Sequence, residues 1–297
     1  MALAVSGALL AGCGGGPAAP NLDAGIDLEP LTVEKPFWYG GFHVVVHQAR
    51  LVSDMDAQFG EELWLTATID NPFEQGWFEA ELRIADHDGA VTTLLRSGTG
   101  REAAPLVAPS TVAPGSLDTT LVIPIPARDL LSPADATLIV GSYDVVQAIV
   151  PLSGTGGRSL EPLSMDLQAS LVAGSIQVDV DPQIPGPLEL RADLPWDHRQ
   201  APAGQVTLTI PMSFRFLDRT GELDSSIVEL RNADSVMFCA ERCPEHIAMT
   251  AGVATGLPVL FLFTPASSDF TLTVQDPYSS AVAPWSFEWT QGSLVSD

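Results

Sequence analysis

Two cysteines and a histidine in the C-terminal part of the chain have residue types and a spacing that suit chemistry. Cys239, Cys243 and His246 follow the pattern Cys-x3-Cys-x2-His. Two nearby cysteines form a disulfide in an exported protein, whereas thiolates and an imidazole also bind zinc. A zinc site needs four ligands, or three and a water, and the spacing points to no fourth. We predict a disulfide between Cys239 and Cys243, with free thiols, or a metal held by these two and His246, as alternatives.

Two histidines, His43 and His47, flank three valines near the start of the chain. On a helix this spacing would place both rings on one face as metal ligands. The segment instead has the alternation of a strand, with Phe42, Val44 and Val46 on the expected core face. Four strand residues span about 13 Å, which is too long for one metal ion with bonds near 2 Å. We therefore predict two surface histidines and no metal site.

Closely spaced acids offer a second type of cation site. The segment from Asp86 to Gly89 resembles the start of a calcium loop, but position 12, a glutamate in an EF-hand, is Ser97 here. A hairpin turn fits this segment better. Two further pairs lie two residues apart, Asp54/Asp56 and Asp179/Asp181. We predict solvated strand faces at these pairs, with weak cation binding as the alternative.

Enzyme motifs are missing from the sequence. It has no Gly-x-Ser-x-Gly, no phosphate-binding glycine loop and no His-Glu-x-x-His. Asp197 and His198, beside Trp196, would supply half of a catalytic set, but spacing points to no nucleophile, and a loop pair of this kind is usually incidental. We therefore expect a protein that is not an enzyme and uses no cofactor. The alternative is an envelope enzyme or metal-dependent protein that uses the clustered acids or the Cys239/Cys243/His246 group.

The N-terminus carries the most specific motif. An apolar run from Ala2 to Ala11 leads into Leu-Ala-Gly-Cys, which ends at Cys13 and is followed by three glycines. This resembles the lipobox of bacterial lipoproteins, in which the cysteine receives a diacylglycerol and becomes the mature N-terminus. The resemblance implies a signal peptide at 1–12, acyl chains such as palmitate on Cys13, and a membrane-anchored place in the cell envelope. No basic residue precedes Lys35, so we place the true start upstream of Met1.

The composition excludes some partners. The chain has 13 basic and 37 acidic residues and a net charge of −24, spread over its whole length. Such a surface repels phosphate backbones, so we expect no nucleic-acid binding. The remaining partners are the membrane, through the lipid, and an envelope protein or glycan. A hydrophobic content of 46% is enough for packed cores.

Alternation predicts the architecture. Apolar and polar residues alternate with a period of two in many segments, for example from Leu63 to Ile69 and from Ile176 to Val180. We therefore expect an all-β protein with two immunoglobulin-like β-sandwich domains after a flexible tether. The expected parts are a tether at 13–36, a first sandwich at 37–152, a linker at 153–159 and a second sandwich at 160–297.

A loose resemblance covers roughly residues 42–150. The run from Leu65 to Pro72, a turn ending at Gly115 and the strand from Thr120 to Pro126 resemble the telokin-like extracellular domains of bacterial lipoproteins. That resemblance implies an immunoglobulin-like fold and assigns no activity.

The two expected domains also end alike. Residues 137–143 and 271–278 share a strand that runs into a turn with a tyrosine, and a short segment ending in proline follows each. We interpret this as a tandem duplication, with chance similarity as the alternative. The aromatic run Phe37-Trp38-Tyr39 opens the first domain, and we expect it in the core, with a partner or glycan platform as the alternative.

Overall fold

The computed structural model describes residues 29–53, 61–72, 81–85, 91–96, 114–125, 132–183, 186–194, 199–221, 223–232, 236–238, 252–264 and 269–288. These residues form twenty strands and two short 3-10 helices, η1 (Pro133–Asp135) and η2 (Ser225–Ile227). Every pairing between the strands is antiparallel. The prediction of an all-β protein is confirmed.

The first half of the chain forms two sheets that share one core. One sheet has the order β1 (Leu31–Tyr39), β2 (Phe42–Ser53), β3 (Glu61–Asn71), β6 (Gly115–Ile125). The other has the order β5 (Val91–Arg96), β4 (Glu81–Ala85), β7 (Thr137–Val140), β8 (Ala148–Pro151). Buried residues of both sheets, among them Phe42, Leu65 and Leu138, belong to one cluster. The prediction that Phe42, Val44 and Val46 face the core is confirmed.

The second half repeats this arrangement. One sheet contains β10 (Ala169–Ala173), β11 (Ile176–Val180), β15 (Val206–Phe216) and β18 (Val253–Phe263) in that order of pairing. The other has the order β17 (Val236–Phe238), β16 (Val228–Arg231), β19 (Asp269–Gln275), β20 (Val282–Glu288). The eight strands of the first half therefore have counterparts in the second half with the same order and pairing. β1 and β2 correspond to β10 and β11, and β3 to β8 correspond to β15 to β20.

Four short strands of the second half have no counterpart in this correspondence. β9 (Leu163–Met165) and β12 (Leu188–Arg191) extend the sheet of β15. β13 (Asp193–Leu194) and β14 (Arg199–Gln200) pair only with each other in the described residues. β12, β13 and β14 all lie between β11 and β15 in the sequence. The corresponding connection in the first half, between β2 and β3, has no strand among the described residues.

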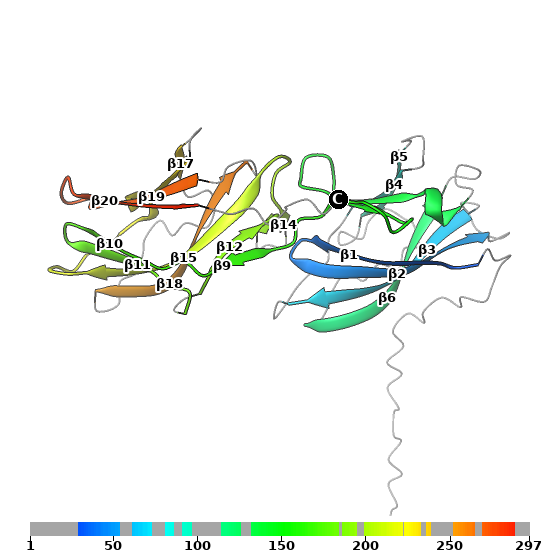
Figure 1. The fold of residues 1–297 in the computed structure, drawn as a ribbon, viewed down its shortest axis with the longest axis horizontal. Helices are drawn as coiled ribbons and strands as arrows, with labels where there is room; N and C mark the ends of the chain where they lie inside the picture. Colours follow the sequence, from blue (N-terminus) through cyan, green and yellow to red (C-terminus); the bar gives the residue numbers. More distant parts are fainter. Residues whose placement is uncertain are drawn as a thin grey trace, which may run out of the picture.

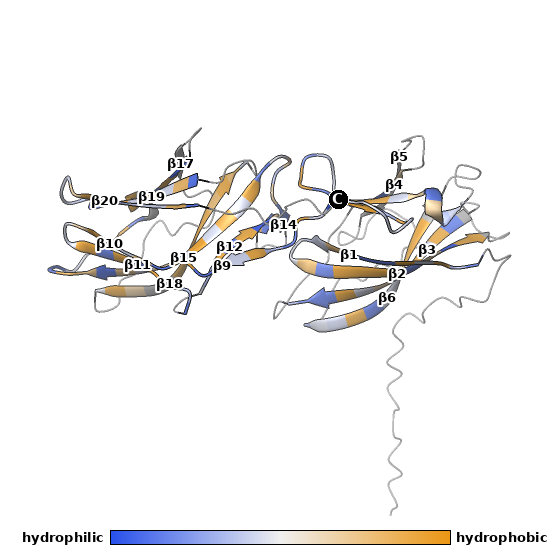
Figure 2. Ribbon diagram, in the orientation of Figure 1, coloured by the Kyte–Doolittle hydropathy of each residue, from blue (hydrophilic) through white to orange (hydrophobic). Residues whose placement is uncertain are grey.

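The two halves have separate cores and lie end to end (Figure 1). One core ends at Leu152 and the other begins at Leu160, so the predicted linker at 153–159 belongs to neither. Orange and blue residues alternate along many strands, as a sandwich with one buried face per sheet requires (Figure 2). Two cores follow directly from the alternating patterns on either side of the glycine-rich stretch.

Two expectations for the N-terminal segment need correction. The predicted tether extends to residue 36, but β1 begins at Leu31 and places Val33 in the core at 7% exposure. Glu34 lies at a break in the β1–β2 register. It interrupts the alternation of apolar and polar residues from which this strand could have been predicted. Phe37 and Tyr39 are buried, as expected. Trp38, also expected in the core, is half-buried on the opposite face of the sheet. Its ring packs against the ring of His43, with the two ring centroids 4.8 Å apart.

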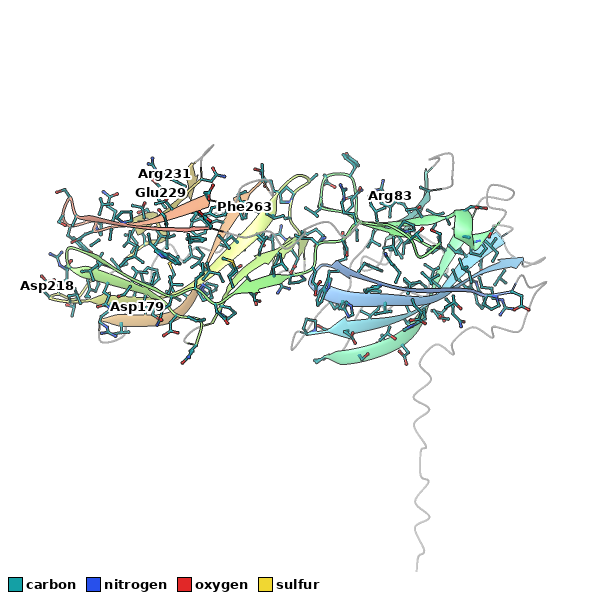
Figure 3. The ribbon with its side chains drawn as sticks, viewed as in Figure 1. Arg83, Asp179, Asp218, Glu229, Arg231 and Phe263 are labelled. Atoms are coloured by element: carbon teal, nitrogen blue, oxygen red, sulfur yellow. The ribbon has the colours of Figure 1, made fainter. Side chains whose placement is uncertain are left out.

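A carboxylate holds together the end of the second sandwich that is farthest from the first, where Asp218 is labelled (Figure 3). Asp276 Oδ2 accepts hydrogen bonds from the Ser175 amide at 3.0 Å and from the hydroxyls of Ser175 and Ser279. Its Oδ1 accepts from the Tyr278 amide at 2.9 Å. These bonds join the β10–β11 turn to the β19–β20 turn. A Cβ on Gly174, whose φ is +55°, would collide with Asp276 Oδ2, so the first turn requires glycine there.

Asp276 makes the stability of this protein sensitive to acid. Hydrogen bonds from the Ser175 and Tyr278 amides lower the pKa of Asp276 from 3.8 to about 2. The stability that this carboxylate contributes is therefore complete above pH 3.8 and is lost as the pH falls towards 2. We expect Asp276→Asn to lower the urea midpoint at pH 7 and to flatten the loss of stability between pH 4 and pH 2.5. The exposed Asp218→Asn is the control, and an equal effect of both variants would contradict the prediction.

Candidate functional site

A chain of polar side chains crosses all four strands on the outer face of the first sheet. Glu34 on β1 contacts His47 Nδ1 at 3.0 Å, and His47 Nε2 contacts Thr68 Oγ1 on β3 at 2.8 Å. Thr68 Oγ1 in turn donates to Asp118 on β6 at 2.6 Å. The sequence pattern placed His47 on the surface, and the structure agrees, but the pattern did not reveal its three partners.

Two irregularities in the strands bring these groups into contact. His47 is the extra residue where the β2–β3 register shifts between Val46 and Gln48. Opposite it, β1 carries its own irregularity, and Glu34 has a φ of +48°, which is uncommon for a residue other than glycine. Bulges of this kind redirect side chains, and here they point Glu34 and His47 to the same outer face.

One hydrogen bond of this chain has a fixed direction, because Thr68 donates its hydroxyl proton to Asp118. The two ring nitrogens of His47 lie within hydrogen-bond distance of Glu34 and of Thr68, and the tautomer of the ring decides which nitrogen donates.

A second pair lies beside the chain on the same face. His43 Nδ1 is 3.1 Å from Asp70 Oδ2, and Trp38 packs against the His43 ring. A hydrogen bond from Ser116, together with that from His43, lowers the pKa of Asp70. Each histidine thus has its own carboxylate partner. Among the residues that the structure describes, no group of three or more metal-ligating side chains is positioned to hold a metal ion.

The Glu34–His47–Thr68 order resembles that of an acyl-transfer triad, but its chemistry differs. Such a triad needs the hydroxyl proton on the side of the histidine, and in this protein the hydroxyl gives it to Asp118. Thr68 also lies within a strand that is paired on both sides, so neighbouring backbone amides are used in the sheet and are not free to stabilise an oxyanion. The arrangement is suited to fastening β1 to the sheet.

Removing the imidazole tests this fastening. We expect His47→Gln to lower the free energy of unfolding by about 1 kcal/mol, because it removes two hydrogen bonds of the imidazole at a partly exposed site. Amide hydrogen exchange in β1 is expected to accelerate more than exchange in β3. The neighbouring exposed Gln48→Ala serves as the control. Unchanged exchange in β1 would mean that the chain does not hold the strand.

A separate set of contacts joins the two sandwiches. Gln200 on β14 accepts a hydrogen bond from the Gly40 amide at 3.0 Å and donates to the Val146 carbonyl at 2.8 Å. The Val146 amide donates to the Ala201 carbonyl, and the Ala203 amide to the Asp144 carbonyl. Gln200 is 8% exposed. Its side-chain amide therefore satisfies the Gly40 N–H and the Val146 carbonyl of the first sandwich at a place with little access to water.

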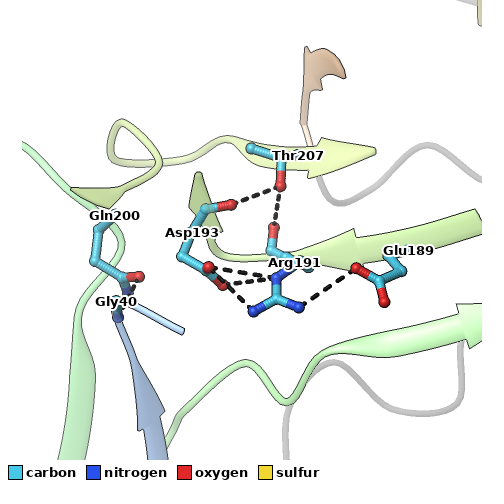
Figure 4. A network of polar contacts seen from close by, with 6 residues as sticks. All are labelled: Gly40, Glu189, Arg191, Asp193, Gln200 and Thr207. Carbon is cyan, nitrogen blue, oxygen red and sulfur yellow. Dashed lines mark hydrogen bonds and ion pairs between the residues drawn. The ribbon is translucent and has the colours of Figure 1, made fainter. Parts of the chain in front are cut away.

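Beside Gln200, a buried ion pair holds the strand that leads into this contact (Figure 4). Asp193, 3% exposed, accepts from Arg191 Nε at 3.1 Å and from Arg191 Nη2 at 3.2 Å. Arg191 also contacts Glu189 at 3.4 Å, and Thr207 donates its hydroxyl to the carbonyl of Asp193. Burial raises the pKa of Asp193, and the nearby Arg191 opposes this rise.

A groove opens at the junction, next to these contacts. Its volume is about 390 Å³, and its walls come from the β7–β8 turn, the linker and residues 203–206 of the second sandwich. Tyr143, 85% exposed, belongs to the lining, and Arg158 supplies the only charge among the lining residues. The other lining residues are the small or apolar Val145, Val146, Leu160, Ala203, Gly204 and Val206 and the polar Gln147 and Gln205. Grooves between domains are common ligand sites.

The turn that carries Tyr143 is braced from below. Gly141 has a φ of +101°. Its carbonyl accepts hydrogen bonds from Arg83 of β4 at 3.0 Å and from the Gln147 amide group at 3.1 Å. The Gln147 amide group also donates to the Ser142 carbonyl. A Cβ on Gly141 would lie 2.7 Å from the Tyr39 ring, so only glycine fits against the core here.

Apart from His43, His47 and the aromatic run at 37–39, the residues singled out in the sequence divide into two groups. Asp179 and Asp181 lie at a shallow groove over β10, β11 and β15, where Asp179 accepts from Ser170 and Gln177 and Asp181 caps a turn through the Gln183 amide. The others lie outside the described residues: Cys13, Cys239, Cys243, His246, Asp54, Asp56, Asp86, His87, Asp88, Asp197 and His198. The predicted lipid attachment, disulfide and metal alternatives therefore stay predictions.

Comparisons with known proteins assign no family. No family model matches the chain, and no curated protein matches it in sequence. Within the part of the chain that the structure describes, no helix has the length and apolar character to cross a membrane.

Proposed function

We propose that this chain is a lipoprotein of the cell envelope, anchored by acyl chains on Cys13, that acts as a non-enzymatic binding module. The observation that carries the binding role is the groove at the junction, where Tyr143 and Arg158 face an otherwise neutral lining. The hydrogen bonds of Gln200 hold both sandwiches at this groove, so its shape is formed in advance of binding. An envelope protein or a glycan is the proposed class of partner.

We also infer that both halves are immunoglobulin-like and arose by duplication. In the first half, β2, β3 and β6 are neighbours in one sheet and β4, β7 and β8 in the other. Strands A, B and E, and strands C, F and G, have this arrangement in immunoglobulin-like sandwiches. The same order of pairing in the second half supports a duplication, and so do the exposed tyrosines Tyr143 and Tyr278 that follow β7 and β19.

Replacing the proposed lipid site tests the anchor. We expect Cys13→Ser to move the full-length gene product, expressed from its native start codon, from the membrane pellet to the soluble fraction. Two or three acyl chains anchor firmly, whereas one alone binds only marginally. Ser6→Ala, in the same apolar segment, is expected to stay in the pellet. Retention of the Cys13→Ser protein in the pellet would disprove the anchor.

Metal analysis of the purified protein distinguishes the binding module from the alternative, a metal-dependent envelope protein that uses Cys239, Cys243 and His246. One equivalent of zinc or copper would favour the alternative, and it would also contradict the predicted disulfide.

A further inference from the structure

We propose that the junction groove binds the C-terminal carboxylate of a peptide whose last side chain is apolar or aromatic. This inference rests on the binding role proposed above and names the chemistry of the ligand. Three observations support it: the positive charge of the groove, the guanidinium of Arg158, which makes no ion pair or hydrogen bond with a described residue, and the hydrogen bonds that hold the turn of Tyr143.

The charge of the groove is opposite to that of the protein. The chain has a net charge of −24, yet the lining carries one formal charge, the cation of Arg158. The nearest acid on the turn, Asp144, is not part of the lining, and its carboxylate accepts the hydroxyl of Ser142. An anion that approaches this acidic protein therefore meets a local cation at the groove.

The guanidinium of Arg158 is available to a ligand. It makes no ion pair or hydrogen bond within the described part of the chain, while most other arginines there contact an acid, a carbonyl or a ring. Its backbone is nevertheless fixed, because Arg158 and Ile149 exchange two hydrogen bonds of 2.6 and 2.7 Å. A planar guanidinium on a fixed backbone suits bidentate contact with a carboxylate.

The remaining walls favour an apolar or aromatic part. Tyr143 presents its ring to solvent at 85% exposure, on a turn held by Arg83 and Gln147. Val145, Val146 and Leu160 are apolar residues that line the same groove. A tyrosine loses little conformational entropy when it contacts a ligand, and it packs well on flat apolar groups.

A pair of matched probes tests the proposal on the full chain. N-acetylphenylalanine carries the carboxylate and an aromatic ring, and N-acetylphenylalaninamide differs only in lacking the charge. We expect the acid to bind with a millimolar dissociation constant in a titration followed by amide chemical shifts, with shifts at residues 143–147, 158–160 and 203–206. The amide is expected to bind at least tenfold more weakly, because the charge-assisted contact is lost.

Arginine variants locate the site. We expect Arg158→Gln to weaken binding of the acid at least tenfold, and Tyr143→Ala to weaken both probes. Arg215→Gln is the matched control, because Arg215 also lines a groove, over β15, and has no ion-pair partner in the described residues. Amide spectra of each variant show whether it is folded.

Three results would overturn the proposal: no binding of the acid at about 10 mM, equal binding of acid and amide, or an equal loss in Arg158→Gln and Arg215→Gln. Each would remove the carboxylate site and leave the anchored binding module standing. That proposal fails separately, through membrane fractionation of Cys13→Ser.

Discussion

Truncating Phe214 to alanine is expected to melt the second sandwich at a much lower temperature and to leave the first sandwich nearly unchanged. Phe214 is fully buried in the core of the second half, and its contacts lie within that core. Removing a buried phenylalanine side chain costs about 3–5 kcal/mol, because it combines lost burial with a cavity. For a domain of this size that corresponds to a fall in Tm of about 10–20 °C, measured by differential scanning calorimetry.

Phe42→Ala is the mirror experiment, because Phe42 is 1% exposed in the other core. It is expected to lower the transition that Phe214→Ala leaves in place. If either variant shifts a single common transition, the two cores unfold as one unit and the division at residues 153–159 is not a domain boundary in the thermodynamic sense.

Replacing Arg191 by glutamine is expected to lower the free energy of unfolding by about 3–5 kcal/mol, because it leaves the buried carboxylate of Asp193 without its cation. Asp193 is 3% exposed, and burial already raises its pKa despite Arg191. Without the arginine, only the protonated carboxyl is well tolerated in the folded state. The loss of stability in the variant should therefore become smaller as the pH falls towards 3.8, the ordinary pKa of an aspartate, measured by urea unfolding.

The double variant Arg191→Met with Asp193→Leu is the informative control. Replacing a buried ion pair by apolar residues of similar size is often close to neutral, so this variant is expected to recover most of the lost stability. Failure to recover would mean that the loss in Arg191→Gln comes from local packing at β12 and β13, not from an unpaired charge.

Local alternation predicted many of the strands, because burial on one face of a sheet imposes a period of two. It failed where a strand departs from that period. The bulge at His47 shifts the alternation in β2, so Ala49 and Leu51 are buried where Phe42, Val44 and Val46 would predict exposed positions. The register break at Glu34 concealed the start of β1 in the same way.

The junction was beyond sequence reasoning for a different reason. Gly40 and Gln200 meet across 160 positions in the chain, and neither belongs to a motif. Tyr143 and Arg158 also carry no spacing that suggests a site, since they come together only when a turn and a linker line one groove. A usable signal existed at Tyr143 alone, because an aromatic residue directly after Gly141-Ser142 lies in a turn that has no core face to bury it.

The position of β1 also decides how the first sandwich carries force. The strand starts at Leu31, where the preceding segment enters, and ends at Tyr39, beside the contact with Gln200. A pull on that segment, resisted at the junction, acts along the axis of β1. Hydrogen bonds of an antiparallel ladder lie across the strands, so the pull loads those between β1 and β2 together and does not open them one at a time. The ladder between β1 and β2 therefore resists a pull along β1 in shear.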